Sequence, residues 1–482
     1  MGTSMEPAGL DRLGHLVDGR IVRDGTTFPV DSPKTGQVVA QCPAATTELL
    51  DEAMAAATRA QPGWAALGED GRRGVMRRMV AALAERLDEV VAITAWEKGS
   101  TDAAGEVYFT PMYVEPLVDE TLPVDVIEDS DERTVRVVRK PVGVVAAISP
   151  WNAPVLIATE KVLSALAVGN TVVAKPSPFT PLATLKLGEI WQDIVPPGVL
   201  NILAGDDEIG AALVSHPATR MVSFTGSVAA GRKIAAAAGL QLKNVLLERG
   251  GNDVAIVLPD VDVATVAPRI FGAAFLGGGQ VCAAIKRLYV HESILDEMVA
   301  ALTELADAAL PAPEEEGGTF GPLTTRPQYD RVRMLIEDAV AHGAKVAAGG
   351  EAVRHDGYFL PPTILTGVGP GVRVVDEEQF GPVLPVLPFS EVDDAVAQAN
   401  ATDYGLSGSV WTSDIAVGEA VAARLECGTT WVNSHAEIAP HIPMGGFKHS
   451  GIGRAGGRPG IDAYAELQTQ YVYKDPQRAS GS

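Results

Sequence analysis

Apolar runs of strand length alternate with segments of helical periodicity through most of the chain. Val142 to Ser149 is apolar, as in a buried strand, and helical spacing follows it until Gly169-Asn170. Further strands are predicted at 171–175, 199–203, 221–224 and 244–247, with helices at 181–191 and after Gly226. A second strand–helix series runs from Val254 to Val432. This order predicts an α/β fold with parallel sheets between helices, which binds ligands at the carboxyl ends of strands.

The part of the chain before Val142 has a different pattern. Short strands are predicted at 19–22, 27–30 and 36–40, and helices from Thr46 and over Arg72 to Val91. Residues 131–140 alternate charged and β-branched side chains, which predicts a ribbon with one solvated face. We expect this ribbon to cover another subunit.

Composition limits the partners of the protein. The 482 residues include 61 acidic and 38 basic side chains, a net charge of -23, so nucleic acid and membrane surfaces are not expected as partners. Three cysteines in this length indicate a reducing compartment. The first residues, Met1 to Glu6, show no secretory signal, and no apolar run has membrane-spanning length, which together predict a cytoplasmic protein. No cluster of His, Cys and carboxylates predicts a metal site.

Two stretches contain candidate catalytic residues. Cys282 follows the triple glycine Gly277 to Gly279, which leaves the backbone open to close approach. Upstream, Glu248 ends an apolar run just before Gly250-Gly251. A thiol and a carboxylate at strand ends beside glycines suggest a nucleophile and a general base. The alternative for Cys282 is an inert core residue, the more common fate of a free cysteine.

Two glycine-rich segments are candidate phosphate loops. Gly451 to Gly456 matches the dinucleotide fingerprint, but no strand precedes it and Arg458-Pro459-Gly460 interrupts the helix that should follow. Ser223 to Gly231 lies at a strand end before a helix that Ser227 could cap, and free backbone N–H groups there would favour a pyrophosphate. The alternative is a plain Gly/Ser turn.

Several short motifs follow one another in a fixed order. They are Pro150-Trp151-Asn152, Lys175-Pro176-Ser177, Phe224-Thr225-Gly226-Ser227, Glu248 with Gly250-Gly251, Gly279-Gln280-Val281-Cys282, Glu377-Glu378-Gln379-Phe380-Gly381-Pro382, Tyr404-Gly405-Leu406 and Gly445-Gly446-Phe447-Lys448. Together they resemble the NAD(P)-dependent aldehyde dehydrogenase superfamily, from Asp31 through Glu466.

The resemblance implies a catalytic role for three residues. Cys282 would attack the aldehyde to give a thiohemiacetal, and the Asn152 amide with the backbone N–H of Cys282 would form the oxyanion hole. Loss of hydride to the nicotinamide leaves a thioester. Glu248 would activate the water that hydrolyses this thioester to a free acid.

The resemblance also implies two binding sites. Lys175 and Glu378 would hydrogen-bond the riboses of NAD, and Phe380 would pack against the nicotinamide. The cofactor residues implied are Pro150, Trp151, Lys175, Ser177, Phe224, Thr225, Gly226, Ser227, Gly250, Glu378 and Phe380. The substrate pocket would contain Ala153, Ile157, Val281, Ala283, His441 and Met444.

The substrate expectations rest on a few side chains. Ala153 leaves room for a bulky or aromatic aldehyde, whereas Glu160 disfavours anionic substrates. His435 and His441 in the 434–444 loop could bind a polar substrate group, with solvated loop histidines as the alternative.

The family architecture implies three structural units. They are an NAD(P)-binding domain at 1–121 and 142–249, a catalytic domain at 250–460, and an oligomerisation ribbon at 122–141 and 461–482. The resemblance implies a homodimer or homotetramer, and the sequence does not choose between them.

Three positions depart from the family pattern. Pro178 replaces the carboxylate that excludes NADP in many NAD-preferring relatives, so some use of NADP is expected. Arg249 replaces a leucine beside Glu248, and we expect it to lower the pKa of Glu248 and slow hydrolysis. Gly277 replaces a common asparagine, which predicts a looser loop before Cys282.

Two other functions stay open at this point. A CoA-acylating relative would transfer the acyl group to a thiol, but such enzymes generally lack a glutamate at the position of Glu248. A non-catalytic binding protein with the same fold is disfavoured by the intact Cys282, Asn152 and Glu248.

Overall fold

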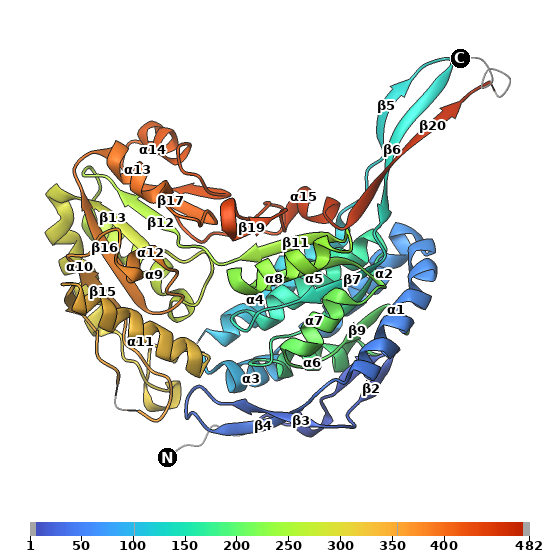
Figure 1. Ribbon diagram of the computed structural model, residues 1–482, viewed down its shortest axis with the longest axis horizontal. Coiled ribbons are helices and arrows are strands. Elements are labelled where there is room, and N and C mark those ends of the chain that lie inside the picture. The colour runs from blue at the N-terminus through green and yellow to red at the C-terminus, as the bar shows by residue number, and fades with distance from the viewer. Residues whose placement is uncertain (1–5, 101, 354, 476–482) are drawn as a thin grey trace.

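The structure is a computed structural model that describes residues 6–100, 102–353 and 355–475. Two α/β lobes lie side by side and an arm of strands projects from one of them (Figure 1). The predicted α/β class is therefore confirmed. Residues 1–5, 101, 354 and 476–482, which belong to the predicted structural units, lie outside the described residues.

The first lobe is built on an eight-stranded sheet in the order β19-β11-β10-β7-β8-β9-β1-β2. The five strands from β11 to β9 are parallel, whereas β19, β1 and β2 add antiparallel edges. The strands are β1 (His15–Val17), β2 (Arg20–Val22), β7 (Val144–Ile148), β8 (Thr171–Lys175), β9 (Leu200–Ile202), β10 (Thr219–Gly226), β11 (Asn244–Arg249) and β19 (Gly451–Ile452).

Helices cover both faces of this sheet, which explains the continuously apolar strands. Alternate residues of β7 enter separate cores: Val145 and Ala147 face one, Val144 and Ala146 the other. The first core is closed by α2 (Gly68–Ala84), α3 (Leu87–Lys98), α4 (Ala103–Asp119), α5 (Pro154–Val168) and α6 (Leu182–Trp191). The second is closed mainly by α1 (Thr47–Ala66), α7 (Asp207–Ser215) and α8 (Val228–Gly239).

The second lobe contains a seven-stranded sheet in the order β14-β15-β16-β13-β12-β17-β18, parallel except for β14. Its strands are β12 (Val254–Val257), β13 (Arg287–His291), β14 (Lys345–Ala348), β15 (Thr363–Thr366), β16 (Val383–Phe389), β17 (Ser407–Trp411) and β18 (Thr429–Val432). Two helices pack on one face, α9 (Val263–Phe275) and α10 (Leu295–Ala308). The other face carries α11 (Arg326–Ala341), α12 (Arg373–Asp376), α13 (Val392–Asn400) and α14 (Ile415–Ala422).

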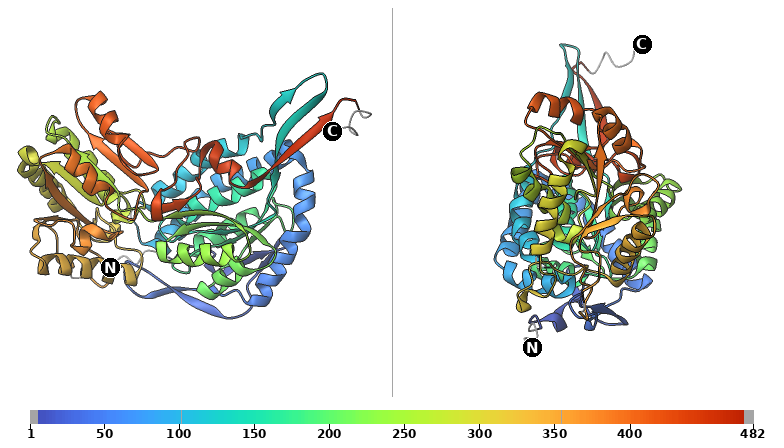
Figure 2. Two further views of the ribbon diagram at one scale, coloured as in Figure 1. Left: turned by 45° about the horizontal axis from the view of Figure 1, so that its top comes forward. Right: turned by 90° about the vertical axis from the view of Figure 1, so that its left-hand side faces the viewer.

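The projecting arm is a three-stranded antiparallel sheet of β5 (Asp125–Asp129), β6 (Arg133–Pro141) and β20 (Ala465–Tyr473). Figure 2 shows it extending clear of the body in both views. Ile127, Leu467 and Tyr471 are exposed on it. The predicted ribbon is thus present, while its role in oligomerisation stays a prediction. A hairpin of β3 (Thr27–Asp31) and β4 (Val38–Pro43) borders the same lobe.

Two helical segments differ from the sequence-based expectation. The single helix predicted over 72–91 is interrupted, because Arg86 leaves helical geometry and its guanidinium binds Glu89 and Glu189. Helical spacing on both sides of this turn made the two helices look continuous. Helix α4, which contains Pro111 and Pro116, was not predicted.

Among the described residues, no helix has both the length and the apolar character required to cross a membrane.

A buried carboxyl joins α3 to the first turn of α6. The Glu97 oxygens accept hydrogen bonds from the backbone N–H groups of Leu182 (2.7 Å) and Ala183 (2.9 Å), and the side chain is fully buried. Glu97 therefore supplies partners to donors that an isolated helix would leave free.

We expect Glu97→Ala to lower the free energy of unfolding by about 2 kcal/mol, because it leaves two buried N–H donors without partners. Urea unfolding of the mutant and wild type would measure this loss. The matched control is Glu115→Ala on the exposed face of α4. Equal effects of the two substitutions would show that the buried bonds contribute nothing.

Candidate active site

Cys282 lies in the loop between a 3-10 turn, η2 (Leu276–Gly279), and β13. Gly277, Gly278 and Gly279 all have left-handed backbone angles, with φ of 59, 68 and 73°. At Gly279 a side chain would also collide with the carbonyl of Gly381. The triple glycine therefore defines a specific turn. Asparagine tolerates a left-handed backbone better than most residues, so either residue suits position 277, and the looser loop stays a prediction.

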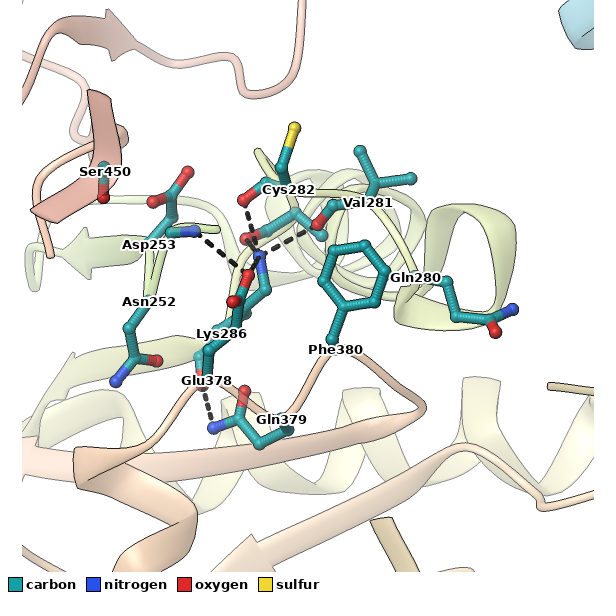
Figure 3. A network of polar contacts seen from close by, with 12 residues as sticks. Asn252, Asp253, Gln280, Val281, Cys282, Lys286, Glu378, Gln379, Phe380 and Ser450 are labelled. Carbon is teal, nitrogen blue, oxygen red and sulfur yellow. Dashed lines mark hydrogen bonds and ion pairs between the residues drawn. The ribbon is translucent and has the colours of Figure 1, made fainter. Parts of the chain in front are cut away.

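The ammonium group of Lys286 lies beneath this loop (Figure 3). Its Nζ donates to the carbonyl oxygens of Val281 (2.9 Å), Cys282 (2.6 Å) and Ala284 (3.3 Å). The same atom lies 3.7 Å from Glu378 Oε1. Lys286 thus fixes the backbone that carries the thiol, a role that the sequence did not suggest.

Burial and neighbouring charges set the pKa of the thiol. Burial raises the pKa of Cys282 to about 12, the positive charge of Lys286 opposes this shift, and nearby carboxylates including Glu248 add to it. Because the thiolate is the nucleophilic form, Lys286 favours the reactive state.

Asn152 lies just beyond the carboxyl end of β7 and contacts the same loop. Its Nδ2 donates to the carbonyl of Gln280 at 2.9 Å. A side-chain amide has a second N–H, so Asn152 can donate to another acceptor beside Cys282.

Glu248 and Arg249 lie next to each other at the end of β11 but point to opposite faces of the sheet. Glu248 Oε2 accepts a hydrogen bond from Thr225 Oγ1 at 3.3 Å, and Arg249 packs on Gly231 of α8. Burial raises the pKa of Glu248, with Lys161 and Arg454 as the opposing charges. The expectation that Arg249 lowers this pKa is therefore wrong, because strand geometry separates the two side chains.

One cavity, of about 520 Å³, lies between the lobes. It contains Pro150, Trp151, Thr225, Gly226, Ser227, Gly250, Glu378 and Phe380 from the predicted cofactor residues. Ser227 caps α8 by accepting a hydrogen bond from the N–H of Ala230 at 3.2 Å, as expected for an N-terminal cap. The rings of Trp151 and Phe380 meet edge to face, with centroids 5.4 Å apart. We call this space the dinucleotide cavity, because its size and its helix N-terminus suit part of a dinucleotide.

Three predicted cofactor residues do not line this cavity. Lys175 is the last residue of β8 and pairs with Ile148 of β7, at the same edge of the sheet. Its Nζ donates to the carbonyl of Pro176 at 3.2 Å. Burial lowers the pKa of Lys175 to about 8. Ser177 Oγ accepts a hydrogen bond from the N–H of Phe179. Phe224 is buried in the second core of the first lobe, and its assignment to the cofactor stays a prediction.

Two further residues of this cavity, Gln328 and Arg331, were not predicted from the sequence. Their side chains donate hydrogen bonds to backbone carbonyls of the segment that carries Glu378. Gln328 donates to the carbonyls of Gln379 (2.7 Å) and Phe380 (2.9 Å), and Arg331 donates to that of Glu378 (3.1 Å). Both lie on α11, whose pattern signalled only an amphipathic helix. Glu378 Oε1 accepts a hydrogen bond from the N–H of Gly251 at 3.0 Å, and burial raises its pKa to about 7.

A second cavity, of about 480 Å³, opens on the other side of the nucleophile loop. We call it the apolar cavity. From the predicted substrate residues it contains Ala153, Ile157, Val281, Ala283 and Met444. The cavity is also lined by the apolar residues Phe109, Tyr113, Leu156, Leu276 and Ile438, of which the first two lie on the unpredicted helix α4. Glu160 is buried in the same wall.

The two histidines of the 434–444 loop have different environments, and only His441 fits the solvated alternative. His441 is exposed and lines neither of these cavities. His435 is not solvated: it is buried, its Nδ1 lies 2.9 Å from Ser409 Oγ, and burial lowers its pKa to about 3.

Five residues line both cavities and so mark the junction between them. They are Asn152, Ile157, Thr225, Arg249 and Cys282. The thiol therefore faces the dinucleotide cavity and the apolar cavity at once, while Glu248 lines the apolar cavity.

Within the described part of the chain, no group of three or more His, Cys, Asp or Glu side chains could hold a metal ion.

The fingerprint match at Gly451 to Gly456 begins with the edge strand β19, which pairs antiparallel with β11.

The two cavities meet at Cys282, beside the carboxyl ends of the first sheet. The family model for the aldehyde dehydrogenase family matches residues 21–470, and the chain belongs to this family. It therefore uses a nicotinamide cofactor to oxidise an aldehyde.

Relatives of known sequence and structure extend over nearly the whole chain. An aldehyde dehydrogenase from Fusarium sp is 37% identical over 92% of this chain and 95% of its own length. A betaine aldehyde dehydrogenase from Cereibacter sphaeroides is 35% identical over 96% of this chain and 97% of its own. The NAD+ complex of an aldehyde dehydrogenase from Bacillus cereus superposes with a TM-score of 0.93 at 32% identity, covering 96% and 97% of the two chains.

We expect Lys286→Met to slow alkylation of Cys282 by iodoacetamide about tenfold at fixed pH, because loss of the ammonium raises the thiol pKa and less thiolate is present. Rate constants measured from pH 7 to 10.5 would show the shift toward higher pH. Lys345→Met, at an exposed position of β14, provides the matched control. An unchanged pH profile in Lys286→Met would contradict the assigned role.

Proposed function

We propose that this protein oxidises a bulky, uncharged, apolar aldehyde to the free carboxylic acid with NAD. The observation that carries the proposal is the position of Cys282 at the junction of the two cavities. An aldehyde in the apolar cavity and a nicotinamide in the dinucleotide cavity would both reach this sulfur.

The groups around Cys282 support each step. The thiol loses its proton to Glu248 or solvent and adds to the aldehyde carbon, and Asn152 donates to the resulting oxyanion. Bound nicotinamide supplies the hydride acceptor, which leaves a thioester on Cys282. Glu248 then takes a proton from the attacking water, and its raised pKa makes it a stronger base than an exposed glutamate.

Release of a free acid is favoured over transfer to CoA by the position of Glu248. The side chain lines the apolar cavity together with Cys282, where an acyl group would be held. A carboxylate there can activate water directly, which a CoA-acylating enzyme does not need.

The walls of the apolar cavity support the substrate class. Its surface is mostly apolar, and Ala153 adds no bulk beside Asn152. Glu160 is buried and Glu248 partly buried in the wall, and both carboxylates would repel an anionic substrate. Relatives are named for betaine aldehyde and for lactaldehyde, which are smaller and more polar than benzaldehyde.

The test is to follow NADH formation with benzaldehyde, betaine aldehyde and glyoxylate as substrates. We expect benzaldehyde to have the highest kcat/KM and glyoxylate the lowest. Glu248→Gln should release about one NADH per site and then stop with an acyl group on Cys282, which intact-mass spectrometry detects, whereas Cys282→Ala should give none. Continuous turnover by Glu248→Gln, or absence of NADH formation by the wild type, would exclude the proposed mechanism.

We also propose that NAD is preferred with measurable use of NADP, because Pro178 offers no carboxylate against a 2′-phosphate. Pro178→Glu should lower kcat/KM for NADP at least tenfold and leave that for NAD nearly unchanged, since only NADP brings a second anion near the new charge. Pro178→Gln is the control of similar size without charge. If the wild type already rejects NADP by several orders of magnitude, the tolerance is disproved.

The proposed assembly is a homodimer or homotetramer formed through the arm at 122–141 and 461–482. The units at 1–121 with 142–249 and at 250–460 would then act as cofactor-binding and catalytic domains. A cytoplasmic location remains the expectation from composition.

A further inference from the structure

Arg249 is a buried cation that lacks a protein partner for part of its guanidinium group. Only 6% of its surface is exposed, and Nε makes no hydrogen bond within the described residues. The aliphatic part of the Arg249 side chain packs against Gly231 of α8. A methyl group added at Gly231 would collide with Cδ of Arg249 and lie 3.1 Å from its Cγ. The absence of a side chain at Gly231 therefore makes room for Arg249 between α8 and β11.

The charges around Arg249 do not neutralise it. Burial lowers its pKa, and the nearby positive charge of Arg232 acts in the same direction. No carboxylate forms a salt bridge with Arg249 among the described ion pairs. Because burying an unpaired charge is costly, such an arrangement suits a site that receives an anion.

The position of Arg249 indicates which anion this is. Arg249 and Arg232 line the dinucleotide cavity together with Ser227, Val228 and Ala229 at the start of α8. The first N–H groups of a helix also attract anions, so two sources of positive potential face the same space. The protein as a whole has a net charge of -23, so this local potential is needed to attract an anionic ligand.

We propose that Arg249 binds the pyrophosphate of the dinucleotide cofactor and thereby strengthens cofactor retention. This inference rests on the proposed dinucleotide function. A 2′-phosphate is the second possible source of the anion, but Lys175, the residue expected at the adenine ribose, does not line this cavity. The pyrophosphate is thus the group that the position of Arg249 favours.

The test is calorimetric binding of ADP, 2′-AMP and adenosine to the full-length protein. We expect Arg249→Leu to weaken ADP binding about tenfold and to flatten its salt dependence, because one charge-assisted contact is lost. Binding of adenosine and of 2′-AMP should change less than twofold, and Arg249→Lys should keep most of the affinity for ADP. Arg78→Leu, at an exposed position of α2, controls for net charge.

A thermal melt separates ligand binding from a structural role. Arg249→Leu should melt no lower than the wild type without ligand, because it removes a buried unpaired charge, and ADP should stabilise it less. Equal affinities of Arg249→Leu and wild type for ADP, or a loss confined to 2′-AMP, would overturn the assignment. Failure of the wild type to bind ADP and NADH would instead exclude the proposed dinucleotide function.

Discussion

Three carbonyl oxygens of the nucleophile loop converge on the single ammonium group of Lys286. These bonds hold the backbone of Cys282 in place without using its side chain, so the sulfur stays free to react. The same ammonium lies near Glu378, which borders the cofactor side. One buried cation therefore ties the position of the nucleophile to the wall of the dinucleotide cavity, and a buried cation of this kind is stable only because polar oxygens surround it.

Burial sets the chemistry of the site as much as geometry does. Cys282, Glu248 and Glu160 all have raised pKa values because water is largely excluded around them. A carboxyl group with a raised pKa accepts a proton more readily than an exposed glutamate and can later return it. The cost of enclosing these groups is offset by the cores on both faces of each sheet.

Both lobes contribute residues to the candidate active site. Glu248 and Asn152 come from strand ends of the first sheet, whereas Cys282 and Glu378 come from segments of the second lobe. The site exists only where the lobes meet. Gly250 permits this contact, since a side chain there would collide with the carboxylate of Glu378.

Local sequence determined the parallel strands of the first sheet and the strand–helix order of the second, because continuous apolar runs bounded by glycine and polar residues are typical of buried strands. It also identified Cys282, Glu248 and Asn152 through short motifs. Only the tertiary structure decided which side chains surround these three residues. The sequence near Lys286, Gln328, Arg331 and Tyr113 does not indicate their roles, because their partners are backbone atoms or lie far away in the chain. The direction of Arg249, away from Glu248 and toward α8, likewise depends on the pleat of a strand within a sheet.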